Sequence, residues 1–298
     1  MWQIYFSRKY SLLRWEEYLE SMNHPLFLKI YKVERTEFLI DGFQIPQSVY
    51  YHPQKYNREV VQLIIKQSLN PQGWENYSKT YWQTVKKIYS FTEKLGKLNL
   101  NKLRDKDLII KLVTSREFML RHFAFGIWGI FILEPHLTSL QFLKSHFPKL
   151  CAEEFMTILT PHTFAAHFKE EYLLSKLNLK NNKVTDRHLQ DYRWIPCVDL
   201  TDEPWAKKDL IARHEFISKQ RIDPVAQKEK ELTQKFQELN KKLSYGQRKL
   251  AKLINQVVYL KDQRDDVRFY ATFYIRQLYN QIAKRLGFFF GTNYFSNR

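Results

Sequence analysis

The feature that most constrains the fold is a long helical pattern over residues 259–287. It begins with a dense charged segment, residues 261–268, and continues as an amphipathic stretch. Gly287 then supplies a helix stop. The pattern predicts one long helix, because apolar residues recur at helical spacing, at Val267, Tyr274, Leu278, Ile282 and Leu286.

The composition fits a mainly helical protein. Only 8 glycines and 10 prolines occur in 298 residues. Loop-rich β folds and nucleotide-binding α/β folds need glycine at turns and phosphate loops, so both are disfavoured. A hydrophobic share of 44%, with 16% aromatic residues, is enough to bury a core.

One β signal stands out near the N-terminus. Residues 37–45 read as two short strands around Asp41-Gly42, a favoured hairpin turn. From residue 57 onward helical periods dominate. One helix is stopped at Asn70-Pro71, and a second covers residues 74–95 and ends at Gly96. Further breaks are predicted near Pro135 and at Phe147-Pro148.

Beyond Pro224 the chain predicts a coiled-coil-like arm. Apolar residues step by threes, fours and sevens up to Leu243, and resume after Ser244-Tyr245-Gly246. A short turn makes two such helices antiparallel neighbours. We therefore predict a mainly α fold with a small N-terminal β-hairpin and a long antiparallel helical hairpin arm. Three segments follow: a mixed segment 1–56, a helical domain 57–220 with an aromatic loop, and the arm 221–298.

Charge and cysteine content bear on partners and compartment. The net charge of +17 favours anionic partners, although a solvated lysine-rich surface explains it equally simply. Cys151 and Cys197 form no C-x-x-C pair, and residues 1–10 hold no signal-peptide core, which predicts a cytoplasmic protein. The apolar run 123–133 is shorter than the roughly 20 residues of a membrane span, so it predicts a buried core helix.

The histidine pair offers no metal site. His162 and His167 are five residues apart, whereas a helical metal pair is spaced i and i+4. No adjacent cysteine or carboxylate completes three or four ligands. We therefore predict neither a metal nor a cofactor.

The charged segment 261–268 has two interpretations. Lys261 with Asp265, and Asp265 with Arg268, stand at i,i+4 and i,i+3, so they are expected to neutralise one another along the helix. Alternatively, Arg264 and Arg268 face a phosphate or a partner. Flanking apolar residues such as Val258 and Leu260 predict that the segment is buried.

An aromatic loop over residues 188–205 also has two interpretations. His188, Tyr192, Trp194 and Trp205 are expected mainly to pack the loop against helices. With Arg193 beside them, they are also candidates for binding a planar or phosphorylated ligand.

Basic residues alternate with aromatic ones, as at Lys86, Lys87 and Tyr89, which is a feature of nucleic-acid surfaces. No reader motif accompanies them. The sequence also lacks a G-x-x-x-x-G-K-[ST] loop, G-x-G-x-x-G, G-x-S-x-G and H-E-x-x-H.

Three elements in order resemble the helical connector of phosphoenolpyruvate-utilising enzymes, the pyruvate phosphate dikinase and phosphoenolpyruvate synthase superfamily. The resemblance spans residues 57–287 and is strongest from residue 160. The first element is the acidic helix Glu170-Glu-Tyr-Leu-Leu174, and the second is the aromatic loop with its Glu-Pro-Trp205. The third is the charged segment, with Lys261, Asp262, Arg264 and Asp265.

The resemblance implies a connector between an ATP-grasp domain and a mobile phosphohistidine domain. Neither the ATP-grasp glycine-rich loop nor a Gly-Gly-x-x-Ser-His motif occurs in this sequence. We therefore expect a truncated or split member that is not catalytic by itself. It would position a phosphohistidine domain, carried by another chain, or an acceptor substrate. The alternatives are a basic helical nucleic-acid-binding protein and a stand-alone interaction scaffold.

Overall fold

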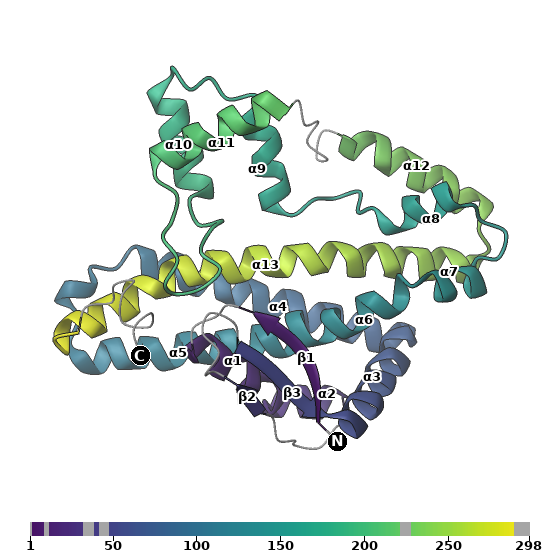
Figure 1. The fold of residues 1–298 in the computed structure, drawn as a ribbon, viewed down its shortest axis with the longest axis horizontal. Coiled ribbons are helices and arrows are strands. Elements are labelled where there is room, and N and C mark those ends of the chain that lie inside the picture. The colour runs from purple at the N-terminus through teal and green to yellow at the C-terminus, as the bar shows by residue number, and fades with distance from the viewer. Residues whose placement is uncertain (1, 9–11, 32–38, 42–47, 221–227, 289–298) are drawn as a thin grey trace. The chain divides into compact units, whose positions relative to one another are not determined.

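The computed structural model describes residues 2–8, 12–31, 39–41, 48–220 and 228–288, and the chain is mainly helical (Figure 1). The helices before the middle of the chain are α1 (Leu12–Met22), α2 (Pro25–Tyr31), α3 (Gln54–Leu69), α4 (Pro71–Gly96), the 3₁₀ turn η1 (Leu100–Lys102), α5 (Asp105–His122) and the π-helical η2 (Phe123–Gly129). Those that follow are α6 (Ile130–Leu137), α7 (Leu140–His146), α8 (Ala152–Leu159), α9 (Ala166–Ser175), α10 (Asn182–Tyr192), α11 (Lys207–Gln220), α12 (Glu229–Lys242) and α13 (Tyr245–Arg285).

Three short strands lie near the N-terminus: β1 (Trp2–Arg8), β2 (Leu39–Asp41) and β3 (Ser48–Pro53). Their order is β1-β3-β2, and both pairings are antiparallel. The predicted hairpin turns at Gly42, and residues 42–47 lie outside the described part of the chain. Asp41 itself lies in β2 and pairs with Val49 of β3, and Ile40 pairs with Tyr50, so the predicted two-residue turn at Asp41-Gly42 is wrong.

A capping residue and a glycine place the start of α4 and the end of α13 where the sequence predicts them. The Asn70 side chain accepts hydrogen bonds from the backbone N–H groups of Gln72 and Gly73, so it caps α4, with Pro71 in the first turn. This is the arrangement that the stop at Asn70-Pro71 implies. At the other end of the chain α13 closes at Arg285, and Gly287 adopts a positive φ of 76°.

The described side chains of the apolar run 123–133 are buried, as predicted: Phe123, Phe125, Ile130 and Leu133 are each at most 1% exposed. The break predicted near Pro135 is confirmed: Pro135 lies inside α6, and this helix ends two residues later at Leu137. A proline beyond the first turn removes an internal hydrogen bond and disfavours continuation of the helix. Among the described residues, no helix is both long and apolar enough to cross a membrane.

The chain forms two compact units, each assembled from separate stretches of sequence. Unit 1 contains Met1–Gly129, Cys197–Glu203 and Val267–Arg298, and unit 2 contains Ile130–Pro196 and Pro204–Asp266. The sequence predicts three consecutive segments, 1–56, 57–220 and 221–298. The two units divide the chain differently, because each unit combines stretches that lie far apart in sequence.

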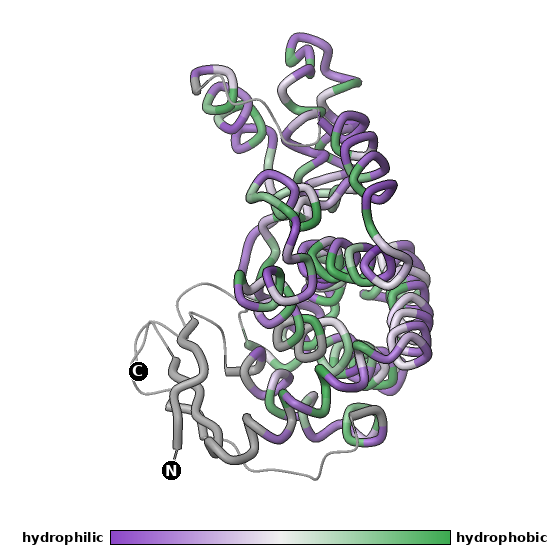
Figure 2. Tube along the Cα trace, turned by 90° about the vertical axis from the view of Figure 1, so that its right-hand side faces the viewer, coloured by the Kyte–Doolittle hydropathy of each residue, from purple (hydrophilic) through white to green (hydrophobic). Residues whose placement is uncertain are grey.

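Unit 1 packs α1, α4, α5 and η2 around an aromatic and aliphatic core that includes Phe27, Tyr81, Ile88, Leu108 and Phe123. Hydropathy alternates along its helices as expected for amphipathic elements (Figure 2). The second half of α13 belongs to this core through Val267 and Leu278, both fully buried.

In unit 2, α9, α10 and α11 pack on one another around Leu174, Leu210 and Ile217. Helix α12 packs against α8, and a two-residue connection then reverses the chain into α13 (Figure 1). Phe236 of α12 stacks on His162, and Asn255 of α13 donates to the Ile158 carbonyl at 3.1 Å. The expected helical hairpin is therefore not a free arm, because α8 and the residues after it engage both of its helices.

Candidate functional site

The acidic helix and the aromatic loop meet at one buried carboxylate in unit 2. Glu170 on α9 is fully buried. One of its oxygens lies 3.2 Å from His188 Nε2 on α10, and the other accepts from Arg213 Nη2 on α11 at 2.9 Å. A carboxylate bound on both oxygens by charged or polar donors is tightly fixed. Glu170 thereby fixes three helices relative to one another.

Aromatic residues of the loop surround this centre. The guanidinium of Arg213 lies 4.3 Å from the ring centre of Trp205, a cation–π distance, and the His188 ring lies 4.9 Å from Tyr192. Trp194 is 5% exposed, and its Nε1–H donates to the Asp191 carbonyl at 2.7 Å. These contacts agree with the packing interpretation of the loop. Arg193, at the C-cap of α10, is exposed.

The charged segment supplies a second anchor in unit 2, through Asp266. Helix α9 begins after Ala165, which offers no capping side chain. The Asp266 carboxylate takes that role from α13: it accepts from the backbone N–H of Ala166, from that of His167 at 3.3 Å, and contacts His167 Nδ1 at 2.6 Å. Its side chain is 4% exposed. A negative group at a helix N-terminus also complements the helix dipole.

The protonation of His167 depends on this carboxylate. Burial, the largest single influence, lowers the pKa of His167, but the hydrogen bond and charge of Asp266, with the charges of Asp262 and Asp265, together raise that pKa above 6.5. Burial raises the pKa of Asp262, and the nearby His167 and Lys261 lower it in part. The contact is thus strongest when His167 is protonated.

Within the charged segment, the predicted local pairing is wrong for Lys261. Its ammonium pairs with Glu134 of α6 at 3.0 Å, among the described residues, and not with Asp265 one turn along its own helix. Both partners keep contact with water, with side chains 44% and 17% exposed. Arg264 and Arg268 are 7% and 5% exposed, which confirms the predicted burial of the segment for these side chains.

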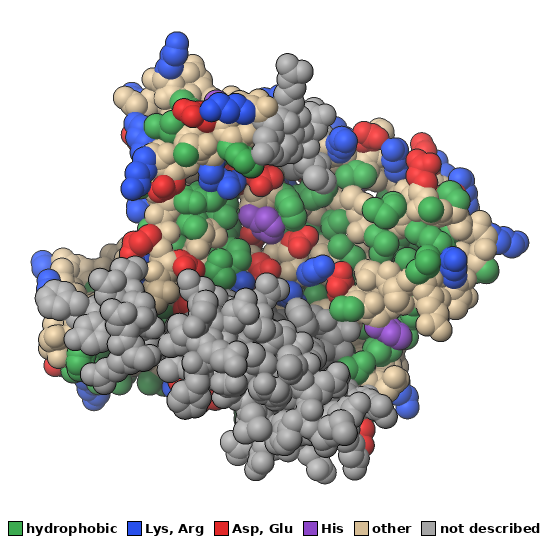
Figure 3. All heavy atoms as spheres, viewed as in Figure 1, with side chains coloured by type: hydrophobic (Ala, Val, Ile, Leu, Met, Phe, Trp, Pro, Cys, Tyr) green, Lys and Arg blue, Asp and Glu red, His purple; other side chains and the backbone are tan. Residues whose placement is uncertain are grey.

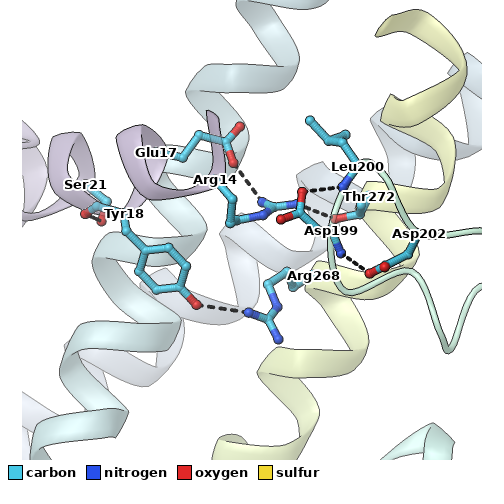
Figure 4. A network of polar contacts seen from close by, with 9 residues as sticks. All are labelled: Arg14, Glu17, Tyr18, Ser21, Asp199, Leu200, Asp202, Arg268 and Thr272. Carbon is cyan, nitrogen blue, oxygen red and sulfur yellow. Dashed lines mark hydrogen bonds and ion pairs between the residues drawn. The ribbon is translucent and has the colours of Figure 1, made fainter. Parts of the chain in front are cut away.

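Unit 1 holds a buried polar network that sequence reasoning missed (Figure 4). Arg14 of α1 is 1% exposed; it donates to Glu17 at 2.7 Å and to the Thr272 hydroxyl of α13 at 2.9 Å. Arg268 donates to the Tyr18 hydroxyl at 2.9 Å. Burial raises the pKa of Glu17, and Arg14 opposes that shift. The sequence does contain a sign of this network. Four polar residues share one helix face at i, i+3, i+4 and i+7, namely Arg14, Glu17, Tyr18 and Ser21.

The tip of the aromatic loop, Cys197–Glu203, belongs to this unit. It closes on itself, with the Asp199 N–H donating to Asp202 at 2.7 Å and the Leu200 N–H to Asp199 at 2.6 Å. Figure 4 shows Asp199 pointing toward the Arg14 guanidinium. Glu203 forms an ion pair with Arg276 of α13. The tip is thereby held on α1 and α13.

In each of these clusters, the charged side chains are bound by other groups of the protein itself. In the described part of the chain, no group of three or more His, Cys, Asp or Glu side chains has an arrangement that could hold a metal ion. The carboxylates of Glu17, Glu170 and Asp266 each bind a cationic or N–H donor of the protein itself. They are suited to fixing helices in place.

Comparison with protein-family models, with curated proteins and with solved structures gives no match for this chain.

Proposed function

We propose that the chain is a non-catalytic helical module of a phosphoenolpyruvate-utilising-type phosphotransferase, which positions a phosphohistidine domain or an acceptor substrate. The observation that supports this role most is the pair of buried carboxylates Glu170 and Asp266. Both belong to the elements of the resemblance, and both tie α9 to helices distant in sequence. A docking module needs helices held rigidly, because pre-organised surfaces lose little freedom on binding.

The arginines differ in how well they could meet a partner. Arg264 and Arg268 are buried, and Arg268 already donates to Tyr18. Arg193 is exposed at the end of α10, next to Trp194, whose Nε1–H donates to the Asp191 carbonyl. The backbone N–H of Trp205 donates to the Arg193 carbonyl at 3.0 Å, which holds the arginine's backbone in place. Arg193 is therefore the proposed contact for a phosphate or a partner domain.

The test begins with the reading frames that flank this one. The proposal expects one of them to encode a Gly-Gly-x-x-Ser-His motif, and expects its product to co-elute with this chain on size-exclusion chromatography after co-expression. Arg193→Glu should weaken the complex, whereas Arg187→Glu, an exposed arginine on the same helix, should not. Absence of such a frame, or separate elution of the two chains, would refute the proposal.

The catalytic aspect is tested separately. Phosphoryl transfer needs placed cations around the phosphates, and we expect the isolated chain neither to hydrolyse ATP nor to accept a phosphoryl group. Acid-labile label on a histidine after incubation with labelled phosphoenolpyruvate would contradict this expectation.

Nucleic-acid binding is the alternative that the net charge of +17 favours. On the face seen in Figure 3, Lys and Arg side chains are interspersed with Asp and Glu over the described residues. An even mixture of charges offers weaker attraction to a phosphate backbone than a continuous basic stripe does.

A further inference from the structure

Helix α5 displays an aliphatic stripe on its outer face. Ile109, Ile110 and Val113 are 55%, 52% and 63% exposed. Their spacing of three and four residues places them side by side on one face. The opposite face of the same helix is buried in unit 1 through Leu108 and Met119, at 1% and 2% exposed. The three stripe residues are therefore not needed to pack α5 into unit 1.

Four lysines lie near the stripe in sequence. The two aspartates in the first turn of α5 are each paired with an arginine. Asp105 pairs with Arg285 at 2.6 Å, and Asp107 with Arg104 at 2.9 Å. Lys97, Lys102 and Lys106 are exposed, and Lys111 is half-buried. These four lysines form no ion pair within the described ranges. The field around the stripe is therefore positive.

The end of α13 adds apolar side chains at the same end of unit 1. Arg285 donates to the carbonyls of Leu100, Asn101 and Leu103 at 3.2, 3.1 and 2.6 Å, which fastens α13 to the start of α5. Directly after it, Leu286 and Phe288 are 65% and 64% exposed. Leu286 and Phe288 therefore follow directly on the residue that binds the start of α5, in the same unit as the stripe and its lysines.

We propose that this surface, the α5 stripe with its lysines and the end of α13, binds the headgroup region of an anionic lipid bilayer. Aliphatic and Phe side chains with a basic surround are the composition of elements that lie at a bilayer surface. Each lysine near such a surface adds attraction to anionic lipid. The binding is peripheral and does not involve a membrane-spanning helix.

Two other classes of partner fit these residues less well. Protein interfaces are depleted in Lys and enriched in Trp, Tyr, Met and Arg at their anchors, whereas here the anchors are mostly Ile, Val and Leu and the surround is Lys. Single-stranded nucleic acid stacks on several aromatic rings, whereas Phe288 is the one aromatic ring among the side chains named for this surface and the others offer no stacking surface. The observations therefore favour the bilayer.

The probe is vesicle co-sedimentation of the full chain with phosphatidylcholine vesicles, with and without about one-third phosphatidylserine. Binding is expected only with phosphatidylserine and should weaken as salt is raised, because screening shortens the reach of the lysines. Lys102→Ala with Lys106→Ala should weaken binding about twenty-fivefold, from about fivefold per lysine. Replacing Ile109, Ile110 and Val113 together by Ser should weaken it at least about tenfold, since apolar burial is lost.

Matched controls separate this surface from general charge and hydrophobicity. Lys86→Ala with Lys87→Ala removes two exposed lysines from α4, and Leu140→Ser with Met156→Ser removes two side chains 58% and 59% exposed in unit 2. Both control variants should bind as the parent does. Circular dichroism of each variant checks that it remains folded. The proposal is overturned if phosphatidylserine vesicles do not bind the parent, if the controls lose as much as the α5 variants, or if soluble phosphoserine competes fully.

Discussion

Replacing Asp266 by Ala should strongly destabilise unit 2. The side chain is 4% exposed and receives the first two backbone N–H groups of α9 together with the His167 ring. Losing a helix cap costs about 1 kcal/mol, and losing a buried hydrogen bond to a charged group costs about 1.5–3 kcal/mol. Because the His167 side chain is 26% exposed, water compensates part of the loss. We expect a decrease of about 3 kcal/mol in the free energy of unfolding, at the lower end of the range for broken buried pairs.

The assay is urea unfolding followed by circular dichroism, with Asp266→Asn and Asp209→Ala as companions. Asp266→Asn keeps one acceptor oxygen and removes the charge, so it should fall between the parent and Asp266→Ala. Asp209 accepts from the Ala206 N–H at 2.8 Å near an exposed helix start, so its removal should cost only about 1 kcal/mol. The two units can unfold separately, and the affected transition is the one to fit. A loss from Asp266→Ala no larger than that from Asp209→Ala would refute the capping argument.

Four further expectations follow from particular contacts. Because the pKa of His167 lies above 6.5 in the folded chain, its contribution to stability is complete below pH 6.5 and is lost as pH rises through the folded value; His167→Gln should flatten that dependence in urea titrations at several pH values. Gly96→Ala should lower the melting temperature, since a Cβ there would lie 2.3 Å from the Tyr274 ring; an unchanged melting temperature would show that the ring moves aside freely. Arg14→Met leaves buried Glu17 without its cation and should cost about 3–5 kcal/mol, most of which Glu17→Gln in the same chain should restore. Binding to single-stranded DNA, measured by fluorescence anisotropy, should be weak, indifferent to sequence and steeply reduced by salt; a tight, sequence-selective complex at physiological salt would favour the nucleic-acid alternative.

Helix boundaries were predictable because their causes are local. The cap at Asn70, the stop at Gly287 and the apolar seam at Phe236, Leu239 and Leu243 depend on residues within a few positions of one another. Backbone hydrogen bonding and side-chain spacing act over one or two turns, so a sequence pattern reports them directly.

The partners of the charged residues were not predictable in the same way. The sequence favoured pairing of Lys261 along its own helix, since only local geometry is visible there, but its partner Glu134 lies 127 positions away. The cap of α9 comes from Asp266, about 100 positions from the N–H groups that it receives. Glu170 likewise meets His188 and Arg213 only because three helices converge on it. The sequence by itself determined which segments are helices and which faces are apolar. The tertiary structure decided which charge meets which, because a buried ion takes whichever opposite group or N–H donor the packing brings within hydrogen-bond distance.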